Sequence, residues 1–145
     1  MSASTVPAVL AALYSLTKTA LPSANVIYGE PTQGQPGDFI CIGWHREQPA
    51  VTNQQSIGDA GIRSSFEDFD VLSEVVAWDG GTDMASCVAR AYALLDVIDE
   101  AVRVDSKLGG AAMQAQRTGS DLTMAQTPDG AMAIVSFTVT VRAQR

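Results

Sequence analysis

The second half of the chain sets the strongest constraint on its fold. Residues 84–105 carry apolar side chains at helical spacing, which predicts one long amphipathic helix. The apolar positions are Met84, Cys87, Val88, Ala91, Leu94, Leu95, Ile98, Ala101 and Val102. On the opposite face, Asp99 and Arg103 are spaced to form an ion pair. Residues 131–141 then alternate apolar and polar, which is typical of a strand with one buried face. A helix and a strand of this kind bury their apolar faces against each other in a two-layer domain.

The first half of the chain adds a second helix and more strands. A helix is predicted over residues 7–21, with Ser4 or Thr5 as its cap and Pro7 in its first turn. Strands are predicted over residues 25–28, 38–45, 66–78 and 112–126. The order of elements predicts an α+β fold, in which two helices pack on one face of a mostly antiparallel sheet. We expect one domain spanning residues 1–145.

Alternation within the strands predicts which side chains share a face. In the strand 38–45, Ile40, Ile42 and Trp44 are expected on one face, with Phe39 and Cys41 on the other. In the strand 66–78, Phe69, Val71, Val75 and Ala77 are expected to face the core, and Asp68, Asp70 and Glu74 to face away from it. The strand 112–126 is expected to be broken near Gly119 and Ser120, and Thr127 to Gly130 to form a hairpin turn.

The segment 46–65 is the least regular part of the chain. It is rich in Gln, Asn, Gly and Ser, and a connection of this length inside a compact domain is usually functional. Either it hangs free as a long loop, or it extends the flanking strands into a projecting hairpin between the central strands. Both alternatives predict an interaction surface. The candidate interface residues are Arg46, Val51, Asn53, Gln54, Gln55, Ile57 and Arg63.

Composition excludes several classes of function. The 145 residues carry a net charge of −7, which argues against binding to nucleic-acid phosphates. No apolar run is long enough to span a bilayer, and residues 1–7 do not resemble a signal peptide, so no membrane association is expected. Cys41 and Cys87 lie in different predicted elements without metal-ligand spacing, which favours two buried free thiols.

No arrangement of residues predicts catalysis or a cofactor. His45 is the single histidine, and a histidine at the end of a strand is more often a surface residue than a catalyst. Asp68, Asp70 and Glu74 could hold a hard cation on their shared strand face, but nothing nearby in sequence completes its ligand shell. A solvated acidic face is the preferred interpretation. We therefore expect neither enzymatic activity, nor a metal, nor a cofactor.

The layout of the chain resembles the tail terminator (tail completion) proteins of long-tailed bacteriophages with non-contractile tails. The resemblance covers nearly the whole chain. It rests on the helix Pro7–Leu21, the strand pair Asn25–His45 with its exit Tyr28-Gly29-Glu30-Pro31, the long loop before Phe66, the strand ending Val75-Val76-Ala77-Trp78, the helix Met84–Asp105, and the hairpin Met113–Arg142 around Asp129-Gly130.

This resemblance implies a structural role in a virion. Proteins of this family form a six-membered ring that caps the finished tail tube, halts its polymerisation and presents the surface where the head docks. The implied partners are other copies of the chain, the tail tube protein and the head–tail connector proteins, with genomic DNA passing the lumen without specific binding. The implied location is the head-proximal end of the virion tail, and the host cytoplasm during assembly. Strands such as 38–45 or 112–126 could pair between subunits.

Two alternatives compete with this interpretation. One is another ring of the same particle, such as a head-completion or connector protein. The other, from a different class, is a small cytoplasmic binding module with a cleft between the helix 84–105 and the sheet.

Overall fold

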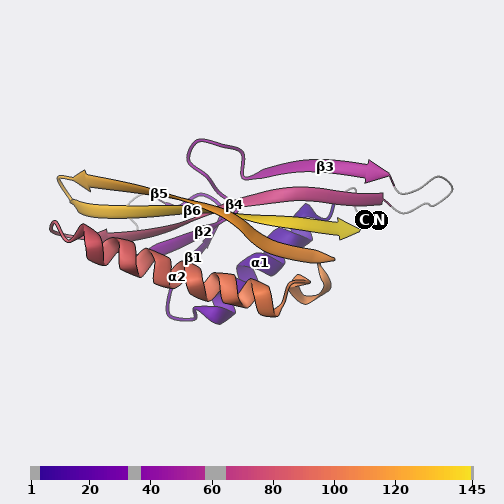
Figure 1. The fold of residues 1–145 in the computed structure, drawn as a ribbon, viewed down its shortest axis with the longest axis horizontal. Helices are drawn as coiled ribbons and strands as arrows, with labels where there is room; N and C mark the ends of the chain where they lie inside the picture. The colour runs from indigo at the N-terminus through magenta and orange to yellow at the C-terminus, as the bar shows by residue number, and fades with distance from the viewer. Residues whose placement is uncertain (1–3, 33–36, 58–64, 145) are drawn as a thin grey trace.

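The computed structural model describes residues 4–32, 37–57 and 65–144. A six-stranded sheet carries both long helices on one of its faces (Figure 1). The elements are α1 (Val6–Ala20), β1 (Asn25–Tyr28), β2 (Phe39–Ile42), β3 (Val51–Ile57), β4 (Ser65–Asp79), α2 (Met84–Val104), the 3₁₀ turn η1 (Leu108–Gly110), β5 (Gln114–Thr127) and β6 (Gly130–Gln144). Among the described strands, β1 and β2 alone pair in parallel, so the predicted α+β fold with a mostly antiparallel sheet is confirmed.

The strands β4 and β6 form the centre of the sheet. They pair from Phe66 opposite Gln144 to Asp79 opposite Ala131. On the other edge of β4, β2 pairs with its C-terminal half and β3 with its N-terminal half. The full order is β1-β2-β4-β6-β5, with β3 paired to β4. Of the two alternatives for the segment 46–65, the hairpin is therefore correct, because β3 pairs antiparallel with the start of β4 (Figure 1).

The helix-covered face of the sheet holds the larger core. As predicted, Phe69, Val71, Val75 and Ala77 of β4 are buried here against the apolar stripe of α2. Alternate residues of β6 complete the layer, with Phe137 almost fully buried. Burial of apolar surface between the two layers is the main force that holds them together.

The opposite, helix-free face carries a second, smaller apolar cluster. It consists of Phe39, Cys41, Val76 and Ile134, with Ile27, Trp44, Trp78 and Met132 packed around it. Trp44 therefore does not share a face with Ile40 and Ile42, and this part of the prediction is wrong. The strand β2 ends at Ile42, and Gly43 follows with φ +72°, which interrupts the alternation before Trp44.

The two helices begin differently. Asp83 caps α2 by accepting a hydrogen bond from the Ser86 N–H, and the predicted pair of Asp99 and Arg103 forms at 2.9 Å. At α1, Thr5 occupies the cap position, but its side chain makes no capping hydrogen bond. Instead the buried Glu67 of β4 accepts hydrogen bonds from the Thr5 N–H and hydroxyl and from the Ser4 hydroxyl. The start of α1 is thus held by a carboxylate from the sheet, which also complements the helix dipole.

The C-terminal strand pair follows the prediction closely. The β5–β6 register shifts between Arg117 and Gly119, at the predicted break, and Thr127 pairs with Gly130 across the turn. Both cysteines are buried and free, as predicted. No helix within the described ranges is long and apolar enough to cross a membrane.

Candidate assembly surfaces

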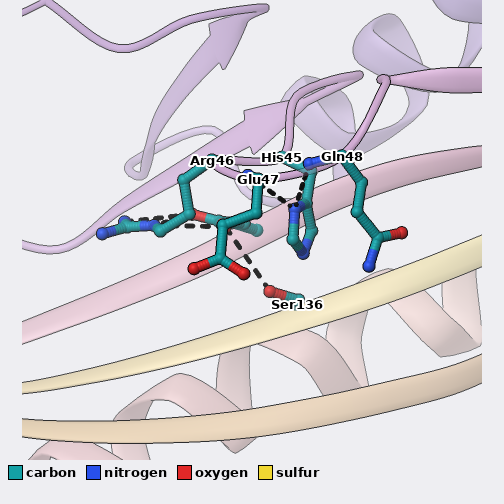
Figure 2. A network of polar contacts seen from close by, with 6 residues as sticks. His45, Arg46, Glu47, Gln48 and Ser136 are labelled. Atoms are coloured by element: carbon teal, nitrogen blue, oxygen red, sulfur yellow. Dashed lines mark hydrogen bonds and ion pairs between the residues drawn. The ribbon is translucent and has the colours of Figure 1, made fainter.

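An ion pair joins the segment before β3 to the helix-free face of the sheet. The Arg46 Nη2 lies 3.1 Å from the Glu74 Oε1, and the Arg46 Nε lies 3.2 Å from the same oxygen. The Ser136 hydroxyl of β6 lies 3.4 Å from the other carboxylate oxygen (Figure 2). The Glu74 side chain is fully buried, whereas 40% of the Arg46 side chain is exposed. A buried carboxylate needs such a partner, so the pair holds Arg46 against the sheet.

The predicted acidic face is only partly correct. Asp68, Asp70 and Glu74 do share the helix-free face, but Glu74 is buried beneath Arg46 and is not solvated. Asp68 lies 3.6 Å from the Arg142 guanidinium, and Asp70 accepts a hydrogen bond of 2.8 Å from the Thr140 hydroxyl. Within the described residues, no three His, Cys, Asp or Glu side chains come together as a metal site would require.

The segment between β2 and β3 is attached at both ends as well as through Arg46. At its start the Gly43 N–H donates to the Ser73 hydroxyl, and at its end the Leu72 N–H donates to the Ala50 carbonyl. Between them the His45 Nδ1 accepts hydrogen bonds from the N–H groups of Glu47 and Gln48 (Figure 2). These contacts give β3 a defined base rather than a free loop.

The candidate interface residues have different positions in this arrangement. Arg46 lies in the base, and Val51 is half-buried against the helix-side core. The other described candidates, Asn53, Gln54, Gln55 and Ile57, follow along β3 in register with β4. The remaining candidate, Arg63, lies outside the described residues. Sequence inspection did not single out Glu74 as the partner of Arg46, or Ser136 as a further contact of Glu74, because these pairs lie 28 and 62 positions apart in the chain.

The sheet has long edges that no described strand covers. The prediction that residues 38–45 form an exposed strand is wrong, since β2 lies between β1 and β4. β5, in contrast, is the last described strand on its side of the sheet, so it has the free edge that the predicted pairing between subunits needs; the pairing itself stays a prediction. Among the described strands, β1 and β3 likewise pair on one side only. A strand at the edge of a sheet can pair with a strand of another chain.

Cys41 gives the helix-free cluster a measurable pH dependence. Burial raises the pKa of its thiol to about 12, with a further increase from the Glu74 carboxylate that Arg46 opposes. Because the folded state favours the neutral thiol, this contribution to stability is complete below pH 9 and is lost as the pH rises from 9 towards 12. We expect the free energy of unfolding, measured with urea, to fall across this range. A Cys41→Ala variant should show a smaller fall, and an equal fall in both proteins would contradict the assignment.

The similarity of this chain to known proteins lies in the fold and not in the sequence. No protein-family model matches the chain, and no curated protein matches its sequence. Among solved structures, a chain of the native gene transfer agent (GTA) particle virion is similar in fold, with a TM-score of 0.57 at 12% sequence identity. The match covers 99% of this chain and 100% of that chain. At this identity the likeness establishes a shared fold.

Proposed function

We propose that the protein is a structural component of a phage-type virion, with no catalytic role. The observation that carries this proposal is the match in fold to a chain of the GTA virion, which covers nearly the full length of both chains. A shared fold is a weaker argument for function than a shared site, so the surfaces of this chain must supply the rest. These surfaces are the β3–β4 hairpin, whose base is fixed, and the edges of the sheet. Both are surfaces through which subunits can assemble.

Within this class, we propose that the chain is a tail terminator. Copies of it form a ring, six-membered as in the family that it resembles, at the head-proximal end of the tail. In a ring each subunit uses one surface to bind a different surface of the next. The β3–β4 hairpin then contacts the tail tube protein, and the opposite side of the ring receives the head–tail connector. The net charge of −7 per subunit repels the DNA backbone, which favours passage of DNA over its retention.

The experiment that tests this function compares particles made with and without the protein. A terminator halts tube polymerisation, so its loss should give overlong tails in electron micrographs. Purified protein should form rings with six-fold symmetry. Tails of normal length that fail to join heads would contradict the capping role and would favour a connector or head-completion ring instead.

Deletion of residues 52–61 tests the role of the hairpin. The described part of this span, residues 52–57, lies at an edge of the sheet, and both residues of the Leu72–Ala50 hydrogen bond at its base lie outside the deletion. We expect the variant to fold, with a circular dichroism spectrum close to that of the unaltered protein, but to leave tails overlong. Unfolding of the variant would show that the hairpin belongs to the core, and tails of normal length would show that the hairpin is not the tube contact.

A further inference from the structure

The strand pairings place residues of β1 and β5, the two outermost strands of the sheet, in shared rows. A row is the set of residues that pair side by side from one strand to the next. From β1 across to β5, the rows are Asn25-Phe39-Val76-Ile134-Thr123, Val26-Ile40-Val75-Val135-Leu122 and Ile27-Cys41-Glu74-Ser136-Asp121. Continuing the register by one residue beyond the last β2–β4 pair, Cys41 and Glu74, places Tyr28 and Ser120 in the next row. Residues 25–28 of one edge and residues 120–123 of the other are therefore at the same height along the strands.

These two edges also run in opposite directions. The strand β1 is parallel to β2, and three antiparallel pairings then lead from β2 through β4 and β6 to β5. Copies in a ring share one orientation relative to the ring axis. Where the β1 edge of one copy lies beside the β5 edge of the next, the two strands are antiparallel, and the equal heights of the two edges bring their rows into line. Antiparallel pairing is the more stable arrangement per residue.

Exposed apolar side chains lie at both edges and on the same face. Tyr28 at the β1 edge is 51% exposed, and Leu122 and Met124 at the β5 edge are 37% and 58% exposed. All three side chains belong to the helix-covered face. Leu122 pairs with Val135 and Met124 pairs with Ala133, and both partners lie in the helix-side core. Val26, two residues before Tyr28 on the same face of β1, lies there too. The Tyr28 ring packs on that of Tyr14 with centroids 5.6 Å apart. Apolar surface of this kind at an edge is typical of an interface.

The residues of β5 that lie in these rows belong to its C-terminal half, where the outer edge of the strand is open. In its N-terminal half, the Ala115 N–H already donates to the Ser106 carbonyl, and the bulge between Arg117 and Gly119 interrupts the strand. From residue 120 to 127, Asp121 is the one charged side chain, and β1 has none. Natural proteins usually protect an edge with lysine, proline or inward charges, so these two edges are suited to be covered by a partner.

We infer that a second copy of this chain is that partner, and that the β1 edge of one copy pairs with the β5 edge of the next. Aligned rows then place Tyr28 beside Ser120 of the neighbouring copy. Leu122 of that copy is the diagonal neighbour, which an aromatic side chain can reach. The contact joins two different surfaces, as closure of a ring requires. The inference rests on the proposed ring and specifies which edges close it.

A cysteine pair tests this contact directly. Within one copy, Tyr28 and Ser120 lie at opposite edges of a five-strand path, about 19 Å apart at the usual strand spacing. A disulfide needs Cα atoms within about 7 Å, so it cannot form inside one copy. We expect the Tyr28→Cys/Ser120→Cys variant, oxidised at a concentration where light scattering detects oligomers, to give a ladder of linked species on non-reducing gels. Either single variant alone should give at most dimers.

Charge substitution provides a second measurement on the full chain. Leu122→Asp should weaken self-association by about tenfold or more, because it places a carboxylate in the apolar contact. Val104→Asp is the matched control, since Val104 is 78% exposed and lies at the C-terminal end of α2, beside α1 residues Leu16, Thr19 and Ala20. Association should be unchanged in this control.

The outcomes distinguish a failure of the inferred interface from a failure of the proposed function. Rings in electron micrographs without the cysteine ladder would overturn the inferred interface and leave the terminator role intact. A ladder from a protein whose loss leaves tail length normal would support the interface and overturn the terminator role. A protein that stays monomeric at every concentration and gives no ladder overturns the interface.

Discussion

Replacement of Gly130 by alanine is expected to destabilise the protein by about 3 kcal/mol or more. Gly130 follows the β5–β6 turn with φ +134°, a conformation that residues with a side chain rarely adopt. A Cβ atom here would overlap the Asp79 carbonyl oxygen and lie 3.0 Å from the Gly80 Cα. These are backbone atoms of the turn between β4 and α2, so they can yield only if the two turns separate. Urea unfolding of the variant measures the loss.

Gly119 offers the matched control for this prediction. It lies in the same strand pair, and an added Cβ would meet no atom within 4 Å. Its φ lies outside the left-handed region. We expect Gly119→Ala to change the free energy of unfolding by no more than about 0.5 kcal/mol. Equal losses at Gly119 and Gly130 would contradict the close approach of the two turns.

Replacement of Arg46 by alanine is expected to cost about 2 to 3 kcal/mol of stability. The cost arises because Glu74 is fully buried and would keep only the Ser136 hydroxyl as a partner. It falls at the lower end of the range for a buried pair, because the Arg46 side chain is 40% exposed and solvent can enter once it is removed. Chemical denaturation of the purified variant measures this loss.

A double variant separates the lost charge partner from lost packing. In Arg46→Ala/Glu74→Gln the buried group is neutral, so most of the stability should return. Arg103→Ala is the control arginine, since Arg103 is 69% exposed and its pairs with Asp99 and Glu100 lie at the helix surface. Its loss should cost less than about 1 kcal/mol. If the double variant is as unstable as Arg46→Ala, the cost comes from the lost packing of Arg46 on Trp44.

The elements with strong periodic patterns were predictable from the chain alone. The apolar stripe of α2 and the alternation along β4 and β6 each indicate burial on one face, and all three elements were found within a few residues of the predicted ends. The β5–β6 turn was also predictable, because it depends on residues a few positions apart.

The predictions that failed depend on contacts between distant parts of the chain. Trp44 lies with the helix-free cluster because the chain turns at Gly43, and alternation alone contains no signal for where a strand stops. From the sequence, Glu74 was predicted to be one of three solvated carboxylates. The structure shows that Arg46 covers it. Likewise, β2 resembled an edge strand because the sequence does not state which strands flank it.

Local side-chain chemistry thus determined, from the sequence, the fold class, the two helices, the main strands and the acidic character of the protein. The tertiary structure decided which strands form the edges, which carboxylate is buried, and that Tyr28 and Leu122 lie on the same face at opposite edges of the sheet. The physical reason is that periodicity is a property of neighbouring residues, whereas strand order and charge pairing depend on segments far apart in the chain. The proposed assembly contacts belong to the second kind.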